Sequence, residues 1–164
     1  MDAIVLLKDD HKTVEKLFKQ YEKAAKQGHE GQNAKAKADL VAEMIQELTT
    51  HTFIEEEIFY PAAKAAAPDT KDHVLESVEE HHMVAWLLSE LGGLDPQDES
   101  FDAKVTVLME NVRHHVKEEE EDWFPTVRAA MGRKLLQDLG EQMAAAKEQA
   151  PSDPLKLSSA RAGV

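Results

Sequence analysis

Cysteine is absent from this sequence of 164 residues. Its absence excludes a disulfide framework, a thiolate zinc site and an iron–sulfur cluster, so any metal must be held by histidine and carboxylate side chains. Long apolar runs are also absent, and none approaches the roughly 20 residues of a membrane-spanning helix. Residues 1–8 are too short and wrongly charged for a secretory signal. We therefore expect a soluble, cytoplasmic protein.

Positive charge is scarce in the chain. There are 19 Lys and Arg residues against 32 Asp and Glu residues, which gives a formal net charge of −13. Such a surface repels the phosphate backbone of nucleic acids and anionic lipid. We expect neither nucleic acid nor membrane as a partner, and we take a monomer as the starting assumption while the acidic faces leave oligomers open.

Residues that favour strands are few. Aromatic residues make up 5% of the chain, and Ala, Glu, Lys, Leu and Gln dominate, which is typical of helices. Breaks near 27–33, 67–69, 92–96 and 131–132 predict four long helices over 2–27, 33–66, 70–92 and 96–130, and a short fifth helix over 133–149. Leu135, Leu136, Leu139 and Met143 would share one face of the fifth helix. Asp95 would cap the fourth helix, with Pro96 at its first position.

The predicted fold is all-α, an antiparallel up-down four-helix bundle with a short C-terminal fifth helix. It would form one domain over residues 1–149, followed by a flexible tail over 150–164. Pro61 and Pro125 lie inside predicted helices and indicate a local adjustment of the helix in both places.

Two segments of the chain repeat each other. His51, Glu55 and Pro61 recur as His115, Glu119 and Pro125 with identical spacing. Each segment is preceded by an acid–histidine pair, Asp10–His11 or Glu80–His81, with a valine three residues after the histidine. The repeat indicates a duplicated set of metal ligands.

The histidines of the repeat lie on the apolar faces of the predicted helices. A histidine and a glutamate four residues apart lie one above the other on a helix, and short loops bring residues of antiparallel helices to similar depths. One buried cluster is therefore predicted, consisting of His11, His51, Glu55, His81, His115 and Glu119. We expect His29, His73, His82 and His114 at the surface.

Four imidazoles and two carboxylates suit iron, manganese or zinc, and a pair of bridging carboxylates favours two metal ions. With a shared oxo or hydroxo group, about one position on each six-coordinate metal would stay open for a small oxygen or nitrogen species.

The neighbours of these residues allow more than one interpretation. Asp10 and Glu80 are either partners of the site or surface charges. The acidic runs at 55–57 and 118–122 are interpreted as solvated faces apart from Glu55 and Glu119, with Glu56 and Glu57 pointing outward. Support of the site by one neighbour of Glu119 stays open. Tyr60 is expected in the core, where it could also serve the site as a hydrogen-bond or electron donor. Whether Tyr60 or His82 joins the ligands stays open.

From Asp10 to Pro125 the chain resembles a hemerythrin-like protein of the histidine-histidine-glutamate (HHE) cation-binding family. The resemblance implies a non-haem di-iron centre with His11, His51, Glu55, His81, His115 and Glu119 as ligands, and a small inorganic ligand such as dioxygen, peroxide or nitric oxide. Oxygen-carrying hemerythrins have a further histidine one turn along the third helix, where this chain has Ser77 and Ala85.

The missing histidine favours redox chemistry on a small oxidant in oxidative or nitrosative stress defence, for example catalase-like peroxide disproportionation. The alternative is sensing of oxygen, iron or redox state, or oxygen binding, without turnover. A ferritin-like site would need Glu-x-x-His on two helices, and only Glu79 and His82 have that spacing. A zinc hydrolase motif of the His-Glu-x-x-His type is absent, and a metal-free helical interaction module remains an open alternative.

Overall fold

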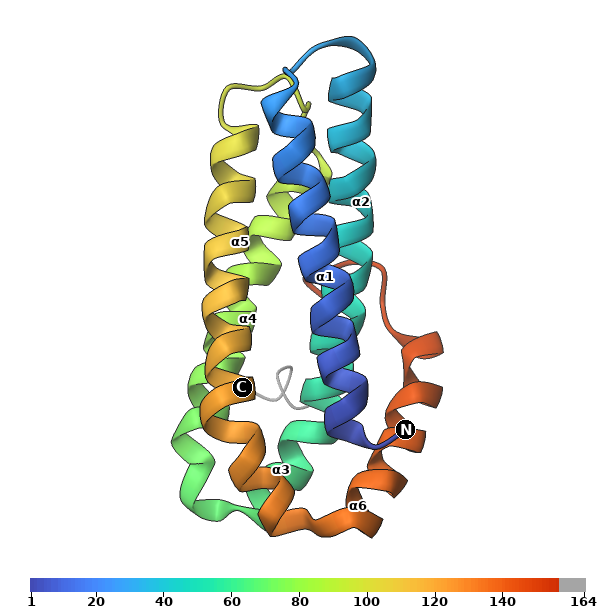
Figure 1. Cartoon of the computed structure of the whole chain (residues 1–164), viewed down its shortest axis with the longest axis vertical. Coiled ribbons are helices and arrows are strands. Elements are labelled where there is room, and N and C mark those ends of the chain that lie inside the picture. Colours follow the sequence, from blue (N-terminus) through green and yellow to red (C-terminus); the bar gives the residue numbers. More distant parts are fainter. Residues whose placement is uncertain (157–164) are drawn as a thin grey trace.

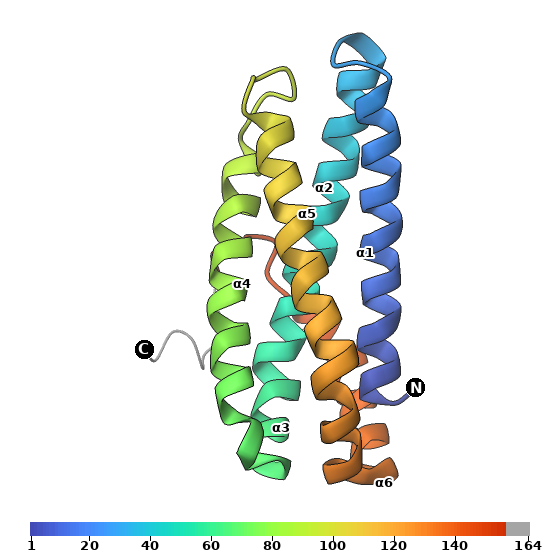
Figure 2. The same cartoon turned by 60° about the vertical axis from the view of Figure 1, so that its left-hand side comes forward.

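The computed structural model describes residues 1–156, and among them helices are the only regular secondary structure. Four long segments run alternately up and down in one bundle (Figures 1 and 2). These are α1 (Ala3–Lys26), α2 (Gly31–Ile54), α4 (Lys71–Gly92) and α5 (Phe101–Lys117). The prediction of an all-α antiparallel bundle is confirmed. No helix in the described range is long and apolar enough to cross a bilayer.

Both α2 and α5 continue into a π-helical turn before the prolines. The turns are η1 (Glu55–Phe59) and η3 (Glu118–Trp123), and they lead into α3 (Tyr60–Ala66) and α6 (Phe124–Ala146). The N–H of Tyr60 donates to the carbonyl of Glu55, and that of Phe124 to Glu119, five residues back in both cases. Proline has no N–H to continue the ordinary ladder. The adjustment predicted from Pro61 and Pro125 is thus a π-turn in each half of the molecule.

The predicted start of the fourth long helix is wrong. The Asp95 carboxylate accepts a hydrogen bond from the N–H of Gln97 at 2.8 Å, within a turn that precedes the helix, and α5 begins only at Phe101. Asp98 accepts similar bonds from Ser100. Asp95 and Pro96 therefore shape the loop between α4 and α5, because an acidic residue before proline caps a turn as readily as a helix.

Helix α6 changes direction at Gly132, where φ is 77° and ψ is 171°. The residues predicted as a separate fifth helix form the second arm of α6, and the 3-10 turn η4 (Lys147–Gln149) follows. Leu136, Leu139 and Met143 of this arm are buried, but Leu135 is exposed, so its predicted place on the apolar face is wrong. Of the predicted tail, residues 150–156 form bends and turns, and 157–164 lie outside the described residues.

The arm packs its backbone directly against the start of α1. A Cβ atom on Gly140 would lie 2.1 Å from the carbonyl oxygen of Met1 and 2.9 Å from the nitrogen of Ala3. Farther along, Lys147 Nζ lies 2.5 Å from Asp10 Oδ1. The arm thus covers the N-terminal end of α1 and reaches the acid–histidine pair of the first half.

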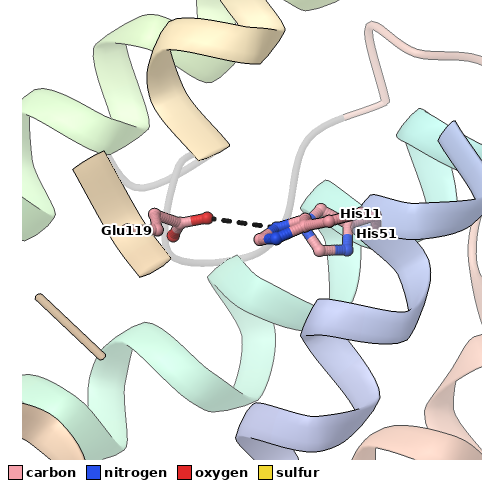
Figure 3. A group of neighbouring side chains, drawn as sticks. All are labelled: His11, His51 and Glu119. Atoms are coloured by element: carbon pink, nitrogen blue, oxygen red, sulfur yellow. Dashed lines mark ion pairs between the residues drawn. The ribbon is translucent and has the colours of Figure 1, made fainter. Parts of the chain in front are cut away.

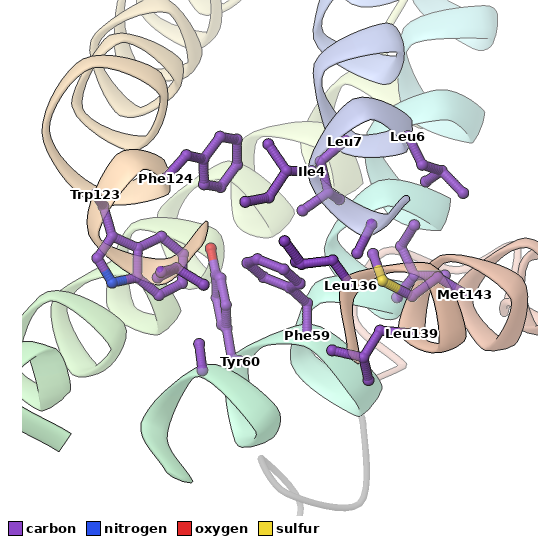
Figure 4. Packing of buried hydrophobic residues seen from close by; sticks show 14 of the residues in the cluster. Ile4, Leu6, Leu7, Phe59, Tyr60, Trp123, Phe124, Leu136, Leu139 and Met143 are labelled. Atoms are coloured by element: carbon purple, nitrogen blue, oxygen red, sulfur yellow. The ribbon is translucent and has the colours of Figure 1, made fainter. Parts of the chain in front are cut away.

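The buried apolar side chains form two separate clusters. The lower cluster joins aromatic residues at the π-turns to α1 and the arm of α6, as Figure 4 shows for Phe59, Tyr60, Trp123, Phe124, Ile4, Leu7, Leu136, Leu139 and Met143. The upper cluster includes Val14, Phe18, Tyr21, Met44, Leu48, Val84, Leu88, Phe101, Leu108 and Val112. Full burial of one such side chain contributes about 1.5–3 kcal/mol. In sequence, the histidines of the repeat fall between these two clusters.

Candidate metal centre

All six residues predicted as ligands are buried, in the interior between the two apolar clusters. His11 lies on α1, His51 on α2, His81 on α4 and His115 on α5, so that each bundle helix contributes one imidazole. Glu55 and Glu119, here called the inner glutamates, are the first residue of η1 and the second residue of η3, and neither has any exposed surface.

The donor atoms fall into two groups. His11, His51 and Glu119 form one group, shown in Figure 3, and Glu55, His81 and His115 form the other. Within each group the donor atoms all lie within 4.8 Å of one another. Each group therefore offers two imidazole nitrogens and one carboxylate oxygen to a single ion.

The inner glutamates also contact the opposite group. Glu119 Oε1 lies 3.4 Å from His11 Nε2 and 3.3 Å from His115 Nε2. Glu55 Oε1 lies 3.0 Å from His51 Nε2 and 3.3 Å from His81 Nε2. Each carboxylate thus stands between a histidine of one group and a histidine of the other, which is the placement that a bridging ligand requires.

Four further acidic residues, here called the outer carboxylates, bind the Nδ1 atoms of the histidines. The distances are 2.8 Å for His11 and Glu120, 3.0 Å for His51 and Asp10, 3.1 Å for His81 and Glu56, and 2.9 Å for His115 and Glu80. Because a carboxylate accepts, Nδ1–H donates in each pair, and Nε2 of every ring is left to face the interior.

This arrangement decides the open question for Asp10 and Glu80, which are partners of the site. It corrects the interpretation of Glu56, which is buried, and it identifies Glu120, whose side chain is 34% exposed and bonded to His11, as the neighbour of Glu119 that supports the site. Both follow an inner glutamate directly. The repeat carried a signal for them, since an acid follows Glu55 and Glu119 alike, but the long acidic runs concealed it.

Several buried atoms at the centre have no hydrogen-bond partner within the described chain. They are Nε2 of His11 and His51, both oxygens of Glu55, and Oε1 of Glu119. Such atoms normally find partners, because an unsatisfied buried polar group costs about 1–3 kcal/mol. All five belong to residues of the two groups, so the residues present fit a metal centre.

Burial and mutual contacts shift the pKa values of the histidines and glutamates at the centre. Burial opposes the charge on His51, but Glu55 and Asp10 outweigh it and raise its pKa to about 10. Burial likewise opposes ionisation of Glu119, yet the charge of His115 and contacts with His11 hold the pKa of this carboxyl well below its usual range. The chain therefore keeps the inner glutamates ionised, and without a cation it takes up protons on the histidines instead.

Tyr60 contacts residues of both groups. Its hydroxyl donates to Glu119 Oε2 at 3.0 Å and lies 3.2 Å from His81 Nε2 and 3.5 Å from His115 Nε2. The ring is buried and stacks on His81, with ring centroids 5.4 Å apart. Tyr60 thus fulfils both parts of its prediction, as a core residue and as a hydrogen-bond donor at the site.

A small cavity of about 30 Å³ adjoins the four histidines on the side of the upper cluster. Apolar side chains make up much of its lining, among them Val14, Leu48, Val84, Val112 and Val116. One water molecule needs about 10–15 Å³ measured in this way, so the cavity holds about two water-sized molecules.

The remaining histidines lie outside this centre. The side chains of His29 and His114 are exposed, and His82 pairs with Glu79 at 2.9 Å. His73 is half-buried and stacks on Trp123 with centroids 4.5 Å apart, so its predicted surface position is wrong. The structure brings His82 into neither of the two buried groups.

Residues 2–127 match the family model described as hemerythrin HHE cation binding domain. The chain belongs to this family. Two relatives of this HHE protein are the uncharacterized proteins Rv2633c of Mycobacterium tuberculosis (strain ATCC 25618 / H37Rv) and Mb2666c of Mycobacterium bovis. Each is 29% identical over 157 residues, which cover 94% of this chain and 91% of the relative.

A solved structure resembles the HHE protein across most of its length. It is the crystal structure of an HHE cation binding domain-containing protein, the Rv2633c homolog from Mycobacterium kansasii. The TM-score is 0.72 at 26% identity, covering 91% of this chain and 86% of that chain. The family resemblance inferred from the two repeats is confirmed, and the family together with the His–Glu groups indicates metal binding.

Proposed function

We propose that this HHE protein holds two iron ions and binds or reacts with a small oxidant, namely peroxide, nitric oxide or dioxygen, in defence against oxidative or nitrosative stress. The ligands would be His11, His51, Glu55, His81, His115 and Glu119. The observation that carries the proposal is the set of unpartnered buried atoms on both inner glutamates and on His11 and His51. Ionised carboxylates without exposure need a positive charge between them.

The two groups of donors support a count of two ions. Each group offers three donor atoms, and each inner glutamate lies between histidines of both groups. Nitrogen and carboxylate donors without a thiolate suit iron, and also manganese and zinc. Iron bound there would supply a ferrous–ferric couple and open coordination positions for a small oxidant.

At the metal position of Glu55, His81 and His115, Tyr60 would serve as a seventh ligand of the centre or as a hydrogen-bond donor to the bound oxidant. Its hydroxyl lies 3.2 Å from His81 Nε2 and 3.5 Å from His115 Nε2, both histidines of that group. The outer carboxylates would keep each imidazole in the tautomer that presents Nε2.

The size of the cavity supports a small ligand. A volume of about 30 Å³ has room for about two water-sized molecules, and the valine and leucine side chains in the lining favour a ligand with little charge.

Turnover and binding are distinguished by adding hydrogen peroxide to the anaerobic, iron-loaded protein. In disproportionation one peroxide is oxidised to dioxygen while a second is reduced to two water molecules, so no external reductant is needed. Catalytic release of dioxygen, recorded with an oxygen electrode, supports an enzyme. A stoichiometric change in absorption without dioxygen release supports sensing or carriage, and a protein that retains no iron contradicts the proposal.

A further inference from the structure

Asp10 and Glu80, two of the outer carboxylates, occupy equivalent positions in the two halves of the molecule but have different surroundings. Asp10 and Glu80 each precede a buried histidine and each accept a hydrogen bond from the histidine of the next bundle helix, His51 or His115. In the first half, the other oxygen of Asp10 binds Lys147 Nζ at 2.5 Å. A cation, the lysine ammonium, thus sits on the outer side of this carboxylate.

In the second half, further potential metal ligands lie beside Glu80, the counterpart of Asp10. His114 of α5 and Glu118, the first residue of η3, lie beside Glu80, and one donor atom of each of these three residues lies within 4.8 Å of the others. His114 Nε2 is 3.0 Å from Glu118 Oε1. By the repeat, the equivalent residues of the first half are Thr50 and Ile54, which offer no imidazole or carboxylate.

The surroundings of the triad are accessible and acidic. Glu80, His114 and Glu118 have side chains that are 32%, 67% and 40% exposed. They line an open groove between α4 and α5, the two helices seen side by side in Figure 2. The other lining residues are Leu75, Glu76, Glu79 and Met83. With four glutamates and neither lysine nor arginine in its lining, the groove attracts hydrated cations.

We propose that Glu80, His114 and Glu118 form a third, solvent-accessible site for a divalent transition-metal ion, separate from the buried centre. The imidazole of His114 at the end of α5 and the carboxylate of Glu118, four residues later at the start of η3, supply two donors, and Glu80 of α4 supplies the third. The ion takes the place that the Lys147 ammonium has in the other half. Because Glu80 also holds His115, an ion bound here is linked to the buried centre through one side chain.

The site is tested on the metal-loaded protein by titration with Mn²⁺, with the electron paramagnetic resonance signal of free Mn²⁺ as the readout. Wild-type protein is expected to bind one Mn²⁺ beyond the metal of the buried centre. His114→Ala and Glu118→Gln should each weaken this binding by about 10-fold or more, as removal of a metal-site residue does. Metal in the buried centre, measured by elemental analysis before the titration, should stay at the wild-type level.

His82→Ala is the matched control, since it removes another histidine of the same surface that pairs with Glu79 outside the triad. It should leave Mn²⁺ binding unchanged. The proposal is overturned if wild-type protein binds no additional Mn²⁺, if His114→Ala binds it as tightly as wild type, or if His82→Ala weakens it equally. Loss of the buried metal is recorded separately, so a failure of the di-iron proposal is not confused with a failure of this site.

Discussion

Tyr60 and Phe124 occupy equivalent positions in the two halves of the molecule, each directly before the proline that follows a π-turn. Each ring stacks on a histidine, Tyr60 on His81 at 5.4 Å and Phe124 on His11 at 6.0 Å. Only Tyr60 carries a hydroxyl, and it donates to Glu119. The two candidate metal positions therefore differ at one oxygen atom, although their histidines and inner glutamates match.

Replacing Tyr60 by phenylalanine should make the two halves alike at this position. The variant should retain its iron, since the six other residues stay, and lose about 1 kcal/mol of stability with the hydrogen bond to Glu119. If the phenolate binds ferric iron, its visible charge-transfer absorption should disappear. Tyr21→Phe, far along α1 in the upper cluster, serves as the control. An unchanged absorption spectrum in Tyr60→Phe would exclude the phenol as a ligand.

Glu119→Ala and His51→Ala test the ligand set. Either substitution removes a donor and leaves buried partners without compensation, so bound iron should fall to less than half of the wild-type content. The free energy of unfolding should fall by about 3–5 kcal/mol, the usual effect of breaking a buried charge pair. Elemental analysis and urea denaturation measure the two effects. Glu121→Ala, exposed on the same π-turn, should change neither, and full iron content in both test variants would refute the assignment.

Glu56→Gln tests the outer carboxylates. The amide cannot accept from His81 Nδ1 as strongly as the carboxylate, so the ring loses its fixed orientation while every inner donor remains. Metal affinity, measured by competition with a chelator, should fall about 10–100-fold. Glu121→Gln should retain the wild-type affinity. Equal affinities in the two variants would reduce Glu56 to a simple structural role.

The sequence predicts the bundle and the convergence of its histidines because both depend on periodicity. Apolar residues spaced by three and four place His11, His51, His81 and His115 on inward faces whatever the loops do. Glu56 could not be placed in this way, since the π-turn after Ile54 rotates the following residues relative to an ordinary helix. Pro61 predicts a local change in the helix, but it does not predict which of the neighbouring acidic residues points inward.

The late start of α5 shows a second limit. Asp95 followed by Pro96 is typical of a helix start, yet the same pair forms a turn when the next residues bond locally. Here Ser100 donates hydrogen bonds to Asp98 within the loop. The helix begins at Phe101, whose ring is buried in the upper cluster. Burial of an aromatic ring, a tertiary event, decides the boundary.

A buried lysine far from the metal centre gives a pH-dependent prediction. Lys37 has no exposed surface, and its Nζ lies 2.7 Å from Asp102 Oδ1, which also accepts from Tyr21. Although burial alone would raise the pKa of Asp102, these bonds lower it below 3.8. The stabilisation is therefore complete above pH 3.8 and is lost as the pH falls through the lower, folded-state pKa.

Asp102→Asn should accordingly destabilise the protein at neutral pH by about 1–3 kcal/mol, less than for a fully buried pair because Asp102 is 39% exposed. The difference from wild type should shrink below pH 3.8, as followed by urea denaturation. Asp39→Asn, which breaks the exposed pair with Lys35, should have little effect at either pH. A difference for Asp102→Asn that is independent of pH would contradict the ionic explanation.

Gly140 and Gly132 should respond differently to alanine. At Gly140 a methyl group would meet the backbone of Met1 and Ala3, so the arm of α6 must move away from α1, and thermal unfolding should occur at a clearly lower temperature. At Gly132 nothing lies within 4 Å, and the effect is the backbone strain of a φ of 77° with a ψ of 171°, a conformation essentially confined to glycine, about 1–3 kcal/mol. Equal effects would show that the arm does not depend on this close approach.

The crossed pairing of histidines and outer carboxylates has a consequence for how the molecule can vary. His11 takes its carboxylate from η3 and His81 from η1, so neither half can assemble its imidazoles without the other, as in a dimer of two-helix chains. A dimer of identical chains would have to repeat every change on both sides. In a single chain the two halves can differ. One metal position has the phenol of Tyr60 beside it where the other has the phenyl ring of Phe124, and Asp10 binds Lys147 whereas Glu80 lies in an open acidic groove.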